Sequence, residues 1–181
     1  MWRRRGFAGS RRPAAYRPAA GRGGEPRILI LGSLPGAESL RRQQYYAHPQ
    51  NGFWRIMGAL FGAGPVLGYP ARLDRLMAAG VALWDVCAEA EREGSLDAAI
   101  RAPRANDLAG FLSLHGGVEV VGLNGGTAAK LFDRLVAPTL GDTLPASRAI
   151  RIARLPSTSP AHARMRLEEK VDRWREGLGA G

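Results

Sequence analysis

The segment Ile28–Trp54, ILILGSLPGAESLRRQQYYAHPQNGFW, joins an apolar run to a polar loop and then to the start of an amphipathic stretch. The run 27–32 is apolar without alternation, which is typical of a parallel strand buried on both faces. A turn rich in glycine and proline, 32–36, then ends the strand. In open α/β sheets, ligands bind where loops leave the carboxyl ends of parallel strands. We therefore expect the loop 32–51 to form the rim of a pocket.

The rest of the chain alternates between strand and helix patterns. Three further apolar runs predict strands, at 81–87, 118–123 and 149–155. Apolar residues at helical spacing predict helices at 52–61, 70–79, 107–114, 128–136 and 164–178. Asn106 is expected to cap the third helix, and the polar residues 88–103 are expected to form a loop. This order predicts an α/β fold, a three-layer αβα sandwich with a central, mainly parallel four-stranded sheet.

The net charge of +10 is unevenly distributed along the 181 residues. Residues 1–24 hold seven arginines and no acid, lack apolar periodicity, and are predicted to form a disordered basic tail. Such a tail suits a DNA tether, a solvated extension or, with less support, a transit peptide. Residues 25–181 are expected to form one domain. Their net charge of +3 fits a protein that contacts a few phosphates rather than one that coats a duplex.

Several classes of site are absent from the sequence. No apolar run approaches the roughly 20 residues that span a bilayer. The single cysteine, Cys87, lies in an apolar run and is expected to be a small core residue. No Cys/His cluster has zinc spacing, and neither a P-loop nor GxGxxG occurs. The loops 32–51, 122–127 and 156–163 are expected to share one rim, and this rim carries hydroxyl, amide and aromatic groups without a carboxylate pair.

Five short motifs point to one family. They are GSLPG at 32–36, YYAHPQNGFW at 45–54, WDV at 84–86, EREGSLD at 91–97 and STSPA at 157–161. In this order the chain resembles the uracil-DNA glycosylase superfamily, and within it the hypoxanthine-DNA, or deoxyinosine, glycosylases of family six. The resemblance covers residues 27–178.

The resemblance implies an enzyme that flips a deaminated base out of DNA and hydrolyses its N-glycosidic bond, without a metal or cofactor. The reaction passes through an oxocarbenium-like sugar, and negative charge develops on the departing base. Such an enzyme must stack the base, read its edge, stabilise that charge and place a water molecule.

Two residues of the second motif carry the main expectations. Tyr46 matches the position where relatives stack an aromatic ring on the flipped base, although a tyrosine of the rim or core is the alternative. Asn51 matches the asparagine that the family uses in catalysis. An amide does not titrate near neutral pH, so Asn51 can hold a water molecule or bond the base but cannot act as a general base. Its position before a predicted helix also suits a simple N-cap.

The remaining matches are less direct. Asn124 matches a position implicated in activity, but it also suits a turn beside Gly125. Many relatives carry an acid or amide at the position of Leu34, which cannot activate water, and a histidine at the position of Ser157, which is a weaker neutral donor. Gly32 and Ser33, together with Leu34, are expected to contribute to the base pocket.

The loop 156–163, called the Ser-Pro loop below, is expected to contact DNA. A wedge leucine of relatives maps to Ala161, so His162 or Arg164 is a candidate to fill the space that the flipped base leaves. The expected DNA-binding residues are Ser157, Thr158, Ser159, Pro160, Ala161, His162 and Arg164, and the expected catalytic residues are Asn51, Asn124 and Ser157.

We therefore expect a monofunctional DNA glycosylase for hypoxanthine, with xanthine and uracil as further substrates. We expect a monomer that acts on double-stranded or single-stranded DNA in the bacterial cytosol. A uracil- or mismatch-specific glycosylase and a non-catalytic nucleic-acid or nucleotide-binding αβα module are the alternatives.

Overall fold

Four parallel strands form the central sheet of the computed structural model, which describes residues 25–91, 100–143, 149–162 and 164–180. The strands lie in the order β2-β1-β5-β6. Ile28, the first residue of β1, pairs with Val81 of β2 on one side and with Val120 of β5 on the other. The strands are β1 (Ile28–Gly32), β2 (Val81–Asp85), β5 (Val120–Asn124) and β6 (Arg151–Leu155).

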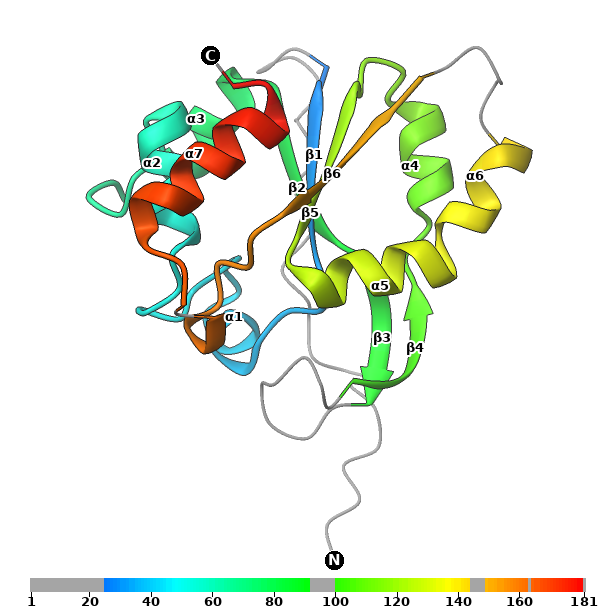
Figure 1. Ribbon diagram of the computed structural model, residues 1–181, viewed down its shortest axis with the longest axis horizontal. Helices are drawn as coiled ribbons and strands as arrows, with labels where there is room; N and C mark the ends of the chain where they lie inside the picture. Colours follow the sequence, from blue (N-terminus) through cyan, green and yellow to red (C-terminus); the bar gives the residue numbers. More distant parts are fainter. Residues whose placement is uncertain (1–24, 92–99, 144–148, 163, 181) are drawn as a thin grey trace, which may run out of the picture.

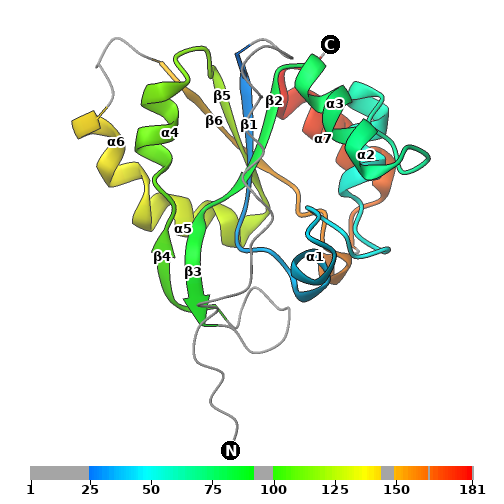
Figure 2. The same cartoon turned by 180° about the vertical axis from the view of Figure 1, so that it is seen from behind.

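Helices cover both faces of this sheet (Figures 1 and 2). One layer holds α2 (Phe53–Phe61), α3 (Tyr69–Ala78) and α7 (Leu167–Leu178), and the other holds α4 (Leu108–Leu114), α5 (Gly126–Leu135) and α6 (Ala137–Thr143). Alternate residues of β1 enter the two cores, since Leu29 and Leu31 pack with α4 and α5 while Ile30 packs with α2 and α7. The predicted three-layer αβα sandwich with four parallel strands is confirmed.

The carboxyl ends of the strands carry the short elements that build the site. The helix α1 (Ala37–Arg42) follows β1, and the 3₁₀ helix η2 (Pro160–His162) follows β6. Figure 1 shows both below the sheet, close to the lower ends of α2 and α7. The edge predicted to carry a pocket is therefore the edge where these loops meet.

The expectation of a loop at 88–103 is wrong for the residues that the structure describes. Cys87–Glu91 forms β3 and Arg101–Ala105 forms β4, and the two strands pair antiparallel with two register shifts. Such irregular pairing interrupts the alternation that marks a strand in a sequence. Residues 92–99, which include all of the EREGSLD motif except Glu91, lie outside the described residues, as does the predicted tail 1–24. Helices α1 and α6 were not predicted either.

The expected cap of α4 is also wrong by one residue. The carboxylate of Asp107 accepts a hydrogen bond of 2.8 Å from the backbone N–H of Gly110, which makes Asp107 the N-cap. Asn106 instead donates its side-chain amide to the carbonyl of Asp85 at 2.8 Å. Asn106 therefore joins the end of β2 to β4, and Asp107 begins the helix.

Two further findings concern the single cysteine and the helices. Cys87 is buried and forms no disulfide, as its apolar surroundings predict. None of the helices in the described part of the chain is long and apolar enough to cross a membrane.

Replacing the cap of α4 should destabilise the fold modestly. Asp107→Ala removes the bond to Gly110 and is expected to lower the free energy of unfolding by about 1 kcal/mol. Urea denaturation measures this change, with Asp74→Ala on the exposed face of α3 as the control. Equal stability of the two variants would contradict the assignment of Asp107 as the cap.

Candidate active site

Asn124 and Thr158 join the end of β5 to the Ser-Pro loop. The Asn124 side-chain N–H donates to the Thr158 hydroxyl at 2.9 Å, and its carbonyl accepts from the Thr158 backbone N–H at 3.0 Å. Both residues are buried, at 9% and 2% exposure. This amide therefore meets Thr158 through both of its ends and holds the loop against the sheet. The alternative of a turn residue with positive φ does not apply, because only Gly125 has positive φ there.

A second contact carries this arrangement to the start of α2. The backbone carbonyl of Thr158 accepts from the backbone N–H of Gly52 at 2.9 Å. Asn51, the preceding residue, accepts from the N–H of Phe53 through its side-chain oxygen at 2.9 Å. Hydrogen bonds thus link the three loops expected to share a rim, from Asn124 through Thr158 to Gly52, the residue that follows Asn51.

Asn51 combines a bond to the first turn of α2 with a position on the rim. The N-cap of α2 is Gly52, so the expected N-cap role of Asn51 is wrong by one residue. Its side-chain oxygen is fixed by the Phe53 N–H, so the amide plane cannot turn over without losing that bond. Asn51 is half-buried and lines a groove between the loop 42–55, the Ser-Pro loop and the start of α7. Within the described chain, the side-chain N–H₂ has no hydrogen-bond acceptor. The bond to Phe53 and a contact with a ligand are compatible, because Phe53 uses one lone pair of the Asn51 oxygen and leaves the second lone pair and the N–H₂ group.

Tyr46 is held between the core and the groove. Its ring stacks on Phe53, with 3.8 Å between ring centroids and 18° between planes. Its backbone has φ of +53°, a strained value for a tyrosine. Tyr46 is half-buried and lines the groove. Because Phe53 covers one face of the ring, only the opposite face can receive a planar ligand.

Gly32 gives the space that brings Tyr46 close to the end of β2. A methyl group at Gly32 would lie 2.6 Å from the carboxylate oxygen of Asp85 and 3.2 Å from the Tyr46 hydroxyl oxygen. Ser33 is buried and its carbonyl accepts from the N–H of Cys87 at 3.0 Å. Leu34 packs on the core shared with α4 and α5. These three residues lie behind the groove and do not line it.

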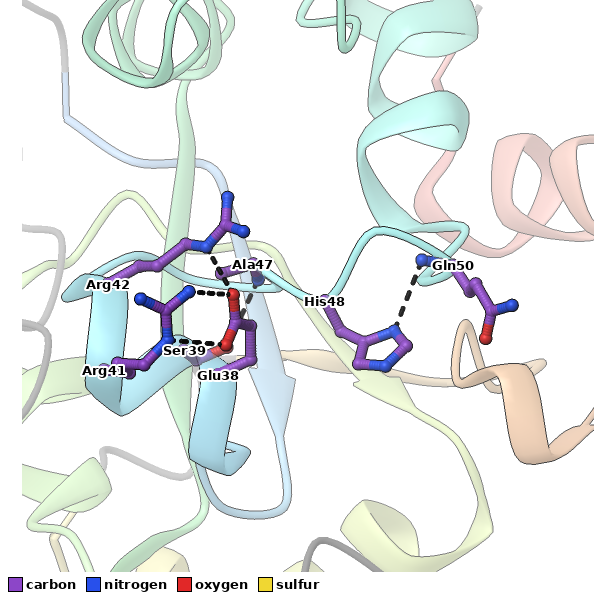
Figure 3. A network of polar contacts seen from close by, with 7 residues as sticks. All are labelled: Glu38, Ser39, Arg41, Arg42, Ala47, His48 and Gln50. Atoms are coloured by element: carbon purple, nitrogen blue, oxygen red, sulfur yellow. Dashed lines mark hydrogen bonds and ion pairs between the residues drawn. The ribbon is translucent and has the colours of Figure 1, made fainter.

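Side-chain bonds also shape the loop between α1 and α2 (Figure 3). The Ser39 hydroxyl accepts from the N–H of Ala47 at 3.2 Å, and Nδ1 of His48 accepts from the N–H of Gln50 at 3.3 Å. Glu38 bonds both Arg41 and Arg42, and mainly the Arg41 bond lowers the pKa of Glu38 to about 2. The side chain of His48 thus helps to fix the turn that leads to Asn51.

The Ser-Pro loop is stabilised by its own hydroxyl groups. Ser157 accepts from the N–H of Ser159 at 3.2 Å, and Ser159 accepts from the N–H of Ala161 at 3.3 Å. Gly125 permits the close approach of Ser157, since a methyl group there would lie 2.8 Å from the Ser157 Cβ. Thr158, Ser159 and Pro160 line the groove, whereas Ser157 does not. The exposed tip consists of Pro160, Ala161, His162 and, beyond residue 163, Arg164.

The groove is strongly basic. It has a volume of about 990 Å³ and lies between the loop 42–55, the Ser-Pro loop and the start of α7. No aspartate or glutamate is among the described residues that line it. Its positively charged lining residues are Arg42, Arg55, Arg72, Arg166 and Lys170.

The structure thus brings some predicted site residues together and separates others. Tyr46, Asn51, Thr158, Ser159 and Pro160 meet in the groove, while Asn124 and Ser157 support it from behind. Within the described chain, no group of three His, Cys, Asp or Glu side chains could hold a metal ion. The cations of the groove belong to no motif and are not among the predicted site residues. A signal existed for Lys170, which is a lysine at helical spacing with the apolar residues Leu167 and Trp174.

Comparisons with known proteins agree with this architecture. The solution NMR structure of a candidate uracil DNA glycosylase from Methanosarcina acetivorans superposes with a TM-score of 0.66 at 32% identity. The match covers 82% of this chain and 87% of that one.

Two curated proteins named hypoxanthine DNA glycosylase are also similar. The protein from Methanosarcina barkeri is 39% identical over 99 residues, and the one from M. acetivorans is 39% identical over 104 residues. These matches span 54% and 57% of this chain, and 63% and 66% of the two relatives.

A family model covers most of the sequence. The model of the uracil DNA glycosylase superfamily matches residues 18–177, which include all the loops of the rim. The chain belongs to the uracil DNA glycosylase superfamily.

Proposed function

We propose that the protein is a monofunctional DNA glycosylase that excises hypoxanthine from DNA and thereby starts base excision repair. The observation that carries the proposal is the rim itself, where an aromatic ring and a fixed amide meet in a basic groove whose described lining residues include no carboxylate. The names of the two curated relatives support hypoxanthine as the base. The groove contains one lysine, Lys170, and its amine is bonded to the Ser-Pro loop, so hydrolysis without a lyase step is the expected chemistry.

The fixed amide of Asn51 supplies the proposed catalytic contact. Its free N–H₂ donates to the keto oxygen of the flipped base, where negative charge grows as the glycosidic bond breaks. The hydrogen bond from a donor that is already fixed in place is stronger with the negatively charged base of the transition state than with the neutral base. This difference lowers the barrier to cleavage of the glycosidic bond. Phe53 holds Tyr46 from behind, so the free face of Tyr46 is the stacking platform.

The same amide explains rejection of adenine. Hypoxanthine shows a keto oxygen beside a ring N–H, so it pairs with an amide N–H₂ and carbonyl in that order. Adenine shows the reverse order, and an amide free to turn over would suit it equally well. The bond from Phe53 to Asn51 prevents this turn. Adenine then leaves polar groups unpaired, at a cost of about 1–3 kcal/mol each.

Uracil is the second candidate substrate. Uracil shares the keto and N–H edge, and the similar protein of known structure is described as a candidate uracil DNA glycosylase. The proposed function therefore includes uracil and xanthine as secondary bases. A monomer acting on duplex or single-stranded DNA is the proposed working form.

A lesion panel tests the proposed function. Duplex oligonucleotides with one hypoxanthine, uracil, xanthine or adenine are incubated with the protein, and alkali cleaves the abasic product for a gel assay. Hypoxanthine is expected to be released fastest, and adenine at least tenfold more slowly because of the unpaired groups. Equal release of adenine contradicts the amide model. Uracil as the only substrate supports the second candidate, and DNA binding without any excision supports a non-catalytic module.

Two substitutions at Asn51 separate a donor from a water-activating group. Asn51→Asp keeps the oxygen that bonds Phe53 but loses the N–H₂ donor, whereas Asn51→Ala loses both. Both variants are expected to reduce single-turnover excision of hypoxanthine about 10²-fold. Full activity of Asn51→Asp would instead show that an oxygen at this position acts on water. Thermal unfolding of the two variants is the control for loss of the bond to Phe53.

Asn124 is expected to act as a positioning residue through Thr158. Asn124→Ala removes two buried bonds and should lower the free energy of unfolding by about 2 kcal/mol. Thr158→Val removes only the hydroxyl bond. The double variant should lose less single-turnover activity and less unfolding free energy than the sum of the losses of the two single variants. The reason is that both single variants break the same bond, between the Asn124 amide and the Thr158 hydroxyl. Additive losses in rate would indicate that Asn124 contacts the substrate directly.

A further inference from the structure

The basic groove contains a cation in an unusual environment. Lys170 is 8% exposed, and burial lowers the pKa of its amine below the ordinary value, an effect to which the charge of Arg55 adds. Its Nζ donates to the carbonyl of His162 at 2.9 Å, which leaves two N–H donors for other acceptors. Lys170 faces the groove from α7. The side chain of Lys170 is thus largely covered, and its ammonium group faces the groove close to a second cation.

Arg55 is the second cation, and it faces the groove from α2. Helices α2 and α7 pack against each other (Figure 1). Residues at the start of each helix line the groove. Arg55 and Lys170 therefore lie in or next to the first turns of their helices, where the positive end of the helix dipole disfavours cations. In the described chain, no carboxylate forms an ion pair with either residue.

Three unfavourable terms thus converge on one place. The covered side chain of Lys170, a second cation close by and the start of α2, whose first turn holds no acid, all raise the local positive potential. Glu168 and Glu169 lie in the first turn of α7, but in the described chain neither lines the groove or pairs with Arg55 or Lys170. A bound anion removes all three penalties at once. The long phosphodiester chain of DNA is the anion that the proposed function supplies.

We infer that Arg55 and Lys170 form a binding site for a backbone phosphate of the DNA strand that carries the lesion. This inference rests on the proposed function. The bond from Lys170 to His162 joins the phosphate site to the end of η2, so a bound phosphate also fixes the exposed tip of the Ser-Pro loop. The phosphate contact and the position of the loop against the base are therefore coupled through one side chain.

The salt dependence of DNA binding tests the phosphate site without requiring excision. The full chain is titrated with an undamaged 20-base-pair duplex and with the same duplex carrying hypoxanthine, at several salt concentrations. Arg55→Gln is expected to weaken binding several-fold and to reduce the slope of log Kd against log salt by about one. Arg175→Gln is the matched control, because Arg175 lies on α7, pairs with Asp172 and does not line the groove.

Variants of Lys170 complete the experiment. Lys170→Met is expected to reduce the slope of log Kd against log salt by the same amount as Arg55→Gln, whereas Lys170→Arg is expected to leave the slope unchanged. Thermal unfolding identifies a variant that no longer folds. Equal slopes for Arg55→Gln and Arg175→Gln overturn the site whatever the behaviour of Lys170. Loss of slope without excision of any lesion retains the phosphate site and rejects only the glycosylase activity.

Discussion

The contact on which the candidate site depends is the pair of hydrogen bonds between Asn124 and Thr158. A parallel strand ends in unpaired polar groups, and a buried polar group without a partner is costly. Here the amide at the end of β5 is matched to the loop that follows β6. That loop in turn accepts the N–H of Gly52 and so fixes the start of α2. One buried amide therefore sets the relative positions of the Ser-Pro loop and Asn51.

The fold could be predicted from sequence where burial on both faces leaves a uniform signal. The run at 28–31 has no polar residue, so only a central parallel strand fits it, and the helices α2 and α7 have clear apolar stripes. The signal fails at the hairpin β3–β4, whose paired charges and register shifts give it neither a strand period nor a helical one. It also fails between Asn106 and Asp107, since both are good caps and only the packing against β2 decides between them.

The site could be predicted in part, because motif residues mark the loops but not the bonds within them. Tyr46 and Asn51 were placed on the rim, yet nothing in the sequence shows that Phe53 fixes both of them. Nor does it show that Asn124 faces Thr158 instead of the groove. Lys170 gave a signal of a different kind, a charge on an apolar helix face. That conflict between local pattern and burial is where function is expected to override stability.

The absence of carboxylates along the described groove constrains how the proposed chemistry can work. With Leu34 packed in the core, no acid of the groove can activate water or balance a cationic sugar. The barrier must then fall through stabilisation of the departing base, which becomes anionic, and the cations that bind the backbone favour that charge as well. DNA binding and bond cleavage thus draw on the same positive potential. A variant that weakens this potential should lose excision together with affinity, and most strongly for bases that depart as poor anions.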